Sequence, residues 1–115
     1  MKIRIKANSL RYRLTQSEVA KLWSEGFLEE RTEFSGKALI YAVVTGNEDT
    51  LSADFIADRI VLNMPKTMID ELYHTDSVGF DDLRGPVNLL VEKDFVCKDK
   101  VEEDQSDNYP NPSIC

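Results

Sequence analysis

The sequence predicts an α+β fold: a mostly antiparallel, strongly curved sheet or partly open barrel of about seven strands, with two helices. Three observations indicate this fold. Most of the chain alternates apolar and polar residues with the period of two that half-buried strands show. Two segments instead repeat apolar residues at helical spacing. Turn residues separate the segments at short intervals, as hairpins require. We expect a single domain over 1–97 and an acidic, proline-containing tail over 98–115 that packs on it.

The N-terminal residues predict two extended runs, 1–7 and 10–14, separated by Asn8 and Ser9. The second run is either a new strand or the first strand continued after a bulge. In both runs apolar residues alternate with basic ones, which we expect to face solvent: Lys2, Arg4, Lys6, Arg11 and Arg13. Residues 1–14 contain no acid, so they carry +5 and the rest of the chain must carry −12 to reach the net charge of −7.

Helix signals occur at two places. Thr15-Gln-Ser-Glu18 is a capping box, in which the Thr15 and Glu18 side chains satisfy each other's backbone groups, so a helix begins there. Gly26 suits the left-handed cap at its end. A second helix begins near Pro65, which the first turn tolerates, and ends at His74. The expected apolar stripes are Val19, Ala20, Leu22 and Trp23 in the first helix, and Met68, Ile69, Leu72 and Tyr73 in the second.

The remaining chain predicts a meander of hairpins. Ser35-Gly36 and Ala57-Asp58 are the expected tight turns. The run 37–45 has apolar residues on both faces, which is typical of a central strand. In chain order the expected strands are 27–34, 37–45, 51–55, 59–64 and 78–80.

The most clearly buried strand is 87–97, whose alternation places one residue in two on the core side: Val87, Leu89, Val91, Phe95 and Cys97. Lys93 falls on the same face, where its ammonium needs a partner or a route to water. Three interpretations are open. Lys93 lies at a sheet edge and reaches solvent, a bulge resets the alternation, or Lys93 is a buried functional amine. The first two are ordinary features of antiparallel sheets.

Composition limits the class of protein. The chain has 115 residues, of which 42% are hydrophobic and 30% charged, values typical of a globular domain. The net charge of −7 disfavours general binding to nucleic acid or to an anionic membrane. The N-terminus lacks the apolar core of a signal peptide, and the two cysteines make no disulfide framework, so we expect a cytoplasmic protein with reduced thiols.

Both ends of the chain carry specific motifs. KIRIKANSLRYRLTQSEV at 2–19 and VEKDFVCKDKVEEDQSDNYPNP at 91–112 resemble the ends of a family of short uncharacterised bacterial proteins. The resemblance covers nearly the whole chain. It implies no activity and no site residue, but it does imply that residues 97–112 are ordered against the domain.

Two sets of side chains suggest chemistry. A soft thiolate beside hard oxygens suits a divalent metal, and the candidate ligands are Cys97, His74, Asp99, Asp104 and Asp107. No CxxC, HxxxH or calcium-loop spacing is present, so the acidic run also fits a solvated segment. Glu92 and Asp94 lie two residues apart on one strand face and suit general acid–base work, although such pairs are also common on faces turned to water.

The basic residues of the first two strands are the third candidate site. They can bind phosphates, but the chain's own acidic tail is a partner at high effective concentration. We predict a non-enzymatic, cytoplasmic protein-interaction or small-ligand-binding domain with no catalytic residue and no cofactor. Its partner is a protein or a small ligand, not nucleic acid or a membrane, and an exposed sheet edge can support a homodimer. The alternative is a metal-binding protein or metal-dependent enzyme that uses Cys97, His74 and the tail carboxylates.

Overall fold

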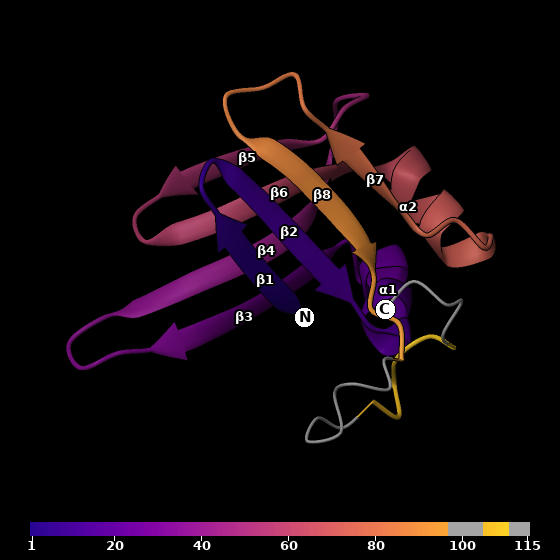
Figure 1. Ribbon diagram of the computed structural model, residues 1–115, viewed down its shortest axis with the longest axis horizontal. Helices are drawn as coiled ribbons and strands as arrows, with labels where there is room; N and C mark the ends of the chain where they lie inside the picture. The colour runs from indigo at the N-terminus through magenta and orange to yellow at the C-terminus, as the bar shows by residue number, and fades with distance from the viewer. Residues whose placement is uncertain (97–104, 111–115) are drawn as a thin grey trace.

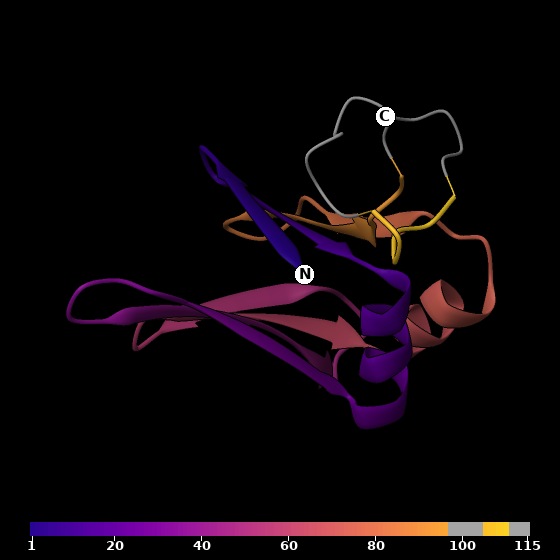
Figure 2. The same ribbon diagram turned by 90° about the horizontal axis from the view of Figure 1, so that it is seen from below.

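The computed structural model describes residues 1–96 and 105–110. Over these residues the chain forms two four-stranded sheets that lie in separate layers, with both helices at one end (Figures 1 and 2). The strands are β1 (Lys2–Lys6), β2 (Ser9–Leu14), β3 (Phe27–Glu33), β4 (Ala38–Gly46), β5 (Ser52–Ile56), β6 (Arg59–Pro65), β7 (Gly79–Asp82) and β8 (Asn88–Lys93), and the helices are α1 (Gln16–Glu25) and α2 (Lys66–His74). None of the helices in these ranges is long and apolar enough to cross a membrane.

The strand order differs from the predicted meander. Sheet A has the order β1-β2-β8-β7, and sheet B has the order β3-β4-β6-β5. In each sheet the outer pairs are antiparallel and the central pair, β2 with β8 or β4 with β6, is parallel. The α+β class and the two helices are confirmed. Most pairings are antiparallel, as predicted. The single curved sheet or partly open barrel of about seven strands is wrong, because β6 inserts between β4 and β5 and the described strands form two mixed sheets.

The two halves of the chain repeat one unit, hairpin–helix–hairpin: β1-β2-α1-β3-β4 and then β5-β6-α2-β7-β8. The first hairpin turns each contain an alanine in the left-handed region, Ala7 with φ 48° and Ala57 with φ 53°, 50 positions apart. Buried residues recur at the same spacing, in the pairs Tyr12 and Leu62, Leu14 and Met64, Val19 and Ile69, and Leu22 and Leu72. Each parallel central pair joins one half to the other, so the halves share both sheets.

Local signals determine both helices as predicted. The Thr15 backbone N–H donates to Glu18 Oε1 at 2.9 Å, which is part of the capping box. Gly26 has φ 76° and closes α1 with an N–H donated to the Leu22 carbonyl at 2.8 Å. The second helix, α2, follows Pro65 and ends at His74.

The core lies between the facing sheets and the inner sides of the helices. Its members are largely aliphatic: Leu14, Val19, Leu22, Leu28, Val43, Leu51, Ile60, Leu62, Met64, Ile69, Leu72, Leu89 and Val91. Tyr12 is the aromatic exception, fully buried as the alternation predicts. Its hydroxyl has no hydrogen-bond partner in the part of the chain that the structure describes. A buried hydroxyl without a hydrogen-bond partner lowers the stability of the folded state, so the Tyr12 hydroxyl destabilises the core.

Replacing this tyrosine, Tyr12→Phe, should raise the free energy of unfolding by about 1 kcal/mol near neutral pH, because it removes the unsatisfied hydroxyl and keeps the ring. Burial also raises the pKa of Tyr12. Above about pH 10 the unfolded chain therefore loses a proton that the folded chain retains, and stability falls as the pH rises. The variant should show a smaller fall. Urea unfolding at neutral pH and at about pH 10.5 measures both effects.

The exposed Tyr73 provides the matched control, since Tyr73→Phe removes a hydroxyl from the surface. We expect it to change stability by less than about 0.5 kcal/mol at neutral pH. A loss of more than about 1 kcal/mol in Tyr12→Phe would contradict the absence of a partner for the hydroxyl.

The strand expected over 87–97 is shorter than predicted, and β8 ends at Lys93. The edge interpretation of Lys93 is wrong, because β8 lies between β2 and β7 and Lys93 is only 5% exposed. The bulge interpretation is also wrong, because the register between β2 and β8 is continuous up to Lys93. Its ammonium donates to the Thr75 carbonyl at 2.8 Å and lies 4.9 Å from the ring centroid of Tyr109, and burial lowers its pKa. Lys93 is a buried amine that joins α2 to sheet A and to residue 109.

Residues 105–110 lie against the start of α1 and the end of β8 (Figure 2). Asp107 accepts hydrogen bonds from the Gln16 backbone N–H at 3.1 Å and from the Ser17 hydroxyl at 2.5 Å. Tyr109 exchanges backbone hydrogen bonds with Asp94 and Val96 at 2.9 and 2.7 Å. The ranges 97–104 and 111–115, which include much of the predicted tail, lie outside the described residues.

Candidate functional site

The basic residues of the N-terminal strands lie on the outer face of sheet A. The alternation that buries Tyr12 turns its neighbours Arg11 and Arg13 to the other face. The antiparallel register then places Arg4 directly opposite Arg11 and Lys2 directly opposite Arg13. Like charges at directly opposed positions destabilise a strand pair unless a counter-charge lies nearby. The counter-charge of each cation therefore decides what this face can bind.

β8 and the residue that follows it supply carboxylates to three of these basic residues. Glu92 lies beside Arg13 in the parallel register, and its Oε1 is 2.9 Å from Arg13 Nε and 2.8 Å from Arg11 Nε. Only the contact with Arg13 has hydrogen-bond geometry, because the buried Nε of Arg11 has no aligned acceptor. Lys2 Nζ lies 2.9 Å from a carboxylate oxygen of Asp94, a residue that is 2% exposed. The two carboxylates considered for acid–base work, Glu92 and Asp94, thus each neutralise a cation.

Arg4 and Lys6 differ from the other three cations. Both are exposed, and within residues 1–96 and 105–110 neither side chain makes an ion pair or a hydrogen bond. Arg4 therefore lies opposite Arg11. The carboxylate nearest to this pair, Glu92, contacts Arg11 and Arg13. The part of the basic face around Arg4 and Lys6 therefore keeps an excess of positive charge.

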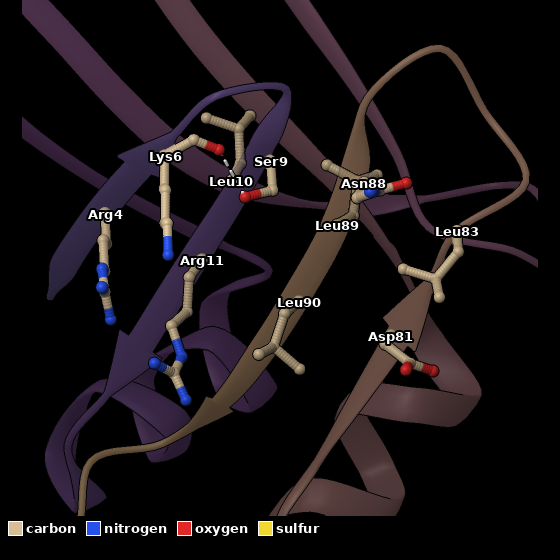
Figure 3. Close-up of a pocket in the computed structure, with 10 residues that line it drawn as sticks. All are labelled: Arg4, Lys6, Ser9, Leu10, Arg11, Asp81, Leu83, Asn88, Leu89 and Leu90. Atoms are coloured by element: carbon tan, nitrogen blue, oxygen red, sulfur yellow. Dashed lines mark hydrogen bonds between the residues drawn. The ribbon is translucent and has the colours of Figure 1, made fainter.

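A pocket of about 360 Å³ opens beside these cations on the outer face of sheet A (Figure 3). Pockets of this size hold small molecules. Its lining combines the cations with apolar and polar residues from four strands and the β7–β8 connection: Arg4, Lys6, Ser9, Leu10, Arg11, Asp81, Leu83, Asn88, Leu89 and Leu90. The cations lie on one side of the pocket, and Leu90 separates them from Asp81 on the other.

Sheet pairing assembles this lining from distant parts of the sequence. Arg11 lies beside Leu90, and Leu90 lies opposite Asp81. The sequence indicated the cations but not Asp81, Leu83, Asn88 or Leu90 as their neighbours. One sequence feature that could have indicated a binding surface is Leu90, an apolar residue that shares the outward face of its strand with Glu92. The alternation gave no indication that β2 and β8 pair in parallel.

The candidate metal ligands are only partly described. Cys97, Asp99 and Asp104 lie outside the described residues. His74 contacts the rings of Trp23 and Tyr73, with centroids 5.3 and 4.9 Å apart. Asp107 instead binds Ser17 at the other end of α1, so the structure does not bring these two residues together. No group of three or more His, Cys, Asp or Glu suited to a metal ion occurs in 1–96 and 105–110.

Comparison with known proteins identifies a matching family. The model of a family described as a family of unknown function, DUF7009, matches residues 1–113. No curated protein and no solved structure matches the chain. The resemblance to an uncharacterised family is confirmed at this level.

Proposed function

The chain belongs to this family of unknown function, so we infer its function from its own geometry. We propose that it is a non-enzymatic domain that binds a small anionic ligand in the pocket on the outer face of sheet A. One observation carries the proposal. Arg4 and Lys6 have no counter-charge in the described part of the chain and line the same pocket as Arg11.

Electrostatics favour an anion at this position. A carboxylate or phosphate between Arg4 and Arg11 would replace the repulsion of two opposed cations by attraction to both. Guanidinium groups also bind such anions through two parallel hydrogen bonds. The net charge of −7 disfavours long polyanions, so a local excess of positive charge suits a small ligand of the kind found in the cytoplasm.

The lining supports binding rather than catalysis. It contains no histidine and no cysteine. Its one hydroxyl, that of Ser9, donates to the Lys6 carbonyl at 2.7 Å and has no adjacent base to activate it. A ligand held here meets charge and apolar surface but no activated nucleophile.

The test is titration calorimetry with two anionic probes, hexanoate and inorganic phosphate. We expect saturable binding of at least one probe to the wild-type chain. The double variant Arg4→Gln with Lys6→Gln should weaken that binding by at least about tenfold, since each lost charge-assisted hydrogen bond is worth about 1.5–3 kcal/mol.

Two exposed cations outside the pocket make the matched control, Lys21→Gln with Arg31→Gln, which removes the same charge from α1 and β3. We expect it to leave the affinity within about twofold of wild type at physiological salt. The proposal fails when neither probe saturates the wild-type chain, or when both double variants lose affinity equally.

A further inference from the structure

We infer that the ligand of this pocket is zwitterionic: an anionic group is held by Arg4, Lys6 and Arg11, and a cationic amino group is held by Asp81, with an apolar spacer lying over Leu90. The inference rests on the proposed function and names the class of ligand. An α-amino acid does not fit it, because its two charges lie on adjacent groups. An ω-amino carboxylate does.

Asp81 is the residue that we expect to bind the cationic group of the ligand. It is exposed on β7 and lines the pocket, yet its carboxylate makes no ion pair or hydrogen bond in the described ranges. Its neighbour Asp82 differs, because it accepts hydrogen bonds from the Arg84 backbone N–H at 3.0 Å and from the Arg84 guanidinium at 2.9 Å. The pocket therefore holds a carboxylate without a counter-charge as well as cations without one.

The register sets the distance between the two charges. Arg4, Arg11, Leu90 and Asp81 are successive cross-strand neighbours on β1, β2, β8 and β7. Adjacent strands lie about 4.8 Å apart, so the backbones of Arg11 and Asp81 are about 10 Å apart and those of Arg4 and Asp81 about 14 Å. Figure 3 shows Leu90 between Arg11 and Asp81. A ligand that reaches both charges needs a spacer of several carbon atoms.

The structure also explains why Arg11 and Asp81 do not pair with each other. Leu90 occupies the strand between them, and Arg11 Nε lies 2.8 Å from Glu92 on that strand. Leu90 is half-buried and Leu83 is 65% exposed, so both offer apolar surface to the spacer. Methylene groups placed there lose contact with water, which favours binding.

The test compares three probes on the full chain by titration calorimetry: 6-aminohexanoate, hexanoate and glycine. Hexanoate lacks the amine, and glycine has both charges without the spacer. We expect the wild-type chain to bind 6-aminohexanoate at least about tenfold more tightly than hexanoate, and glycine more weakly than either. In Asp81→Asn the affinity for 6-aminohexanoate should fall to that for hexanoate, while hexanoate binding stays within about twofold.

Asp49→Asn is the matched control, because Asp49 is an exposed acid on the β4–β5 turn, outside the pocket. It should leave the preference for 6-aminohexanoate intact. Equal binding of hexanoate and 6-aminohexanoate to the wild type, with no effect of Asp81→Asn, would overturn the inference of a zwitterionic ligand. The proposal that the pocket binds an anion would still hold. If none of the three probes binds and phosphate does not bind either, the proposal that the pocket binds an anion is wrong as well.

Discussion

Gly79→Ala is expected to destabilise the domain by about 3 kcal/mol, because the new methyl group has no space. A Cβ at Gly79 would lie 2.3 Å from the Val91 carbonyl oxygen and 2.7 Å from Glu92 Cβ. Gly79 is paired directly with Glu92 in the register of β7 and β8. Since β8 is a central strand held by hydrogen bonds on both sides, its backbone cannot move away without breaking a ladder. Urea unfolding measures the effect as a lower midpoint with an unchanged slope.

Gly85→Ala provides the control for this substitution. Its nearest contact would be the Val87 carbonyl oxygen at 3.9 Å, an ordinary van der Waals distance. We expect Gly85→Ala to change the free energy of unfolding by less than about 0.5 kcal/mol. Similar urea midpoints for the two alanine variants would contradict the close contact between Gly79 on β7 and residues Val91 and Glu92 on β8.

The helices and hairpins could be predicted because short-range chemistry determines them. The start of α1 depends on Thr15 and Glu18, three residues apart, and its end on Gly26. The β3–β4 and β5–β6 hairpins likewise depend on turns within a few residues, and Ala57 and Asp58 do adopt positive φ. The central position of β4 is also confirmed, since apolar residues on both of its faces require cover on both sides.

The arrangement of the sheets could not be predicted in the same way. Alternation identifies the buried face of a strand but not its neighbours, and Ser9 pairs with Asn88 across most of the chain. One unused signal was the internal repeat. IKANSLRYRLTQSEVAKLW at 5–23 and FIADRIVLNMPKTMIDELY at 55–73 align without a gap in their apolar positions. That repeat predicts two equivalent hairpin–helix units rather than a simple meander.

The candidate site could likewise be predicted only where it depends on local sequence and not where it depends on strand pairing. The charge pattern of residues 1–14 indicated the basic face, because it depends only on alternation along each strand. The selection among the five cations depends on tertiary structure: Glu92 reaches Arg11 and Arg13, and leaves Arg4 and Lys6 without a carboxylate of their own in the described ranges. Asp81 joins the site through β8, so its role depends on two strand pairings at once.

Leu22→Ala and Leu72→Ala should each lower the free energy of unfolding by about 3 kcal/mol, and the two losses should agree within about 1 kcal/mol. The two leucines are fully buried and occupy equivalent positions on α1 and α2, 50 residues apart. Each truncation removes the same atoms from the same kind of site, a helix face packed on a shared core. Urea unfolding of both single variants, with the exposed Leu83→Ala as control, measures this. A cost below about 1 kcal/mol for one leucine and about 3 kcal/mol for the other would show that the two halves do not contribute equally to the core, because the cost of a Leu→Ala change depends on how tightly the site is packed and on how far the cavity can close.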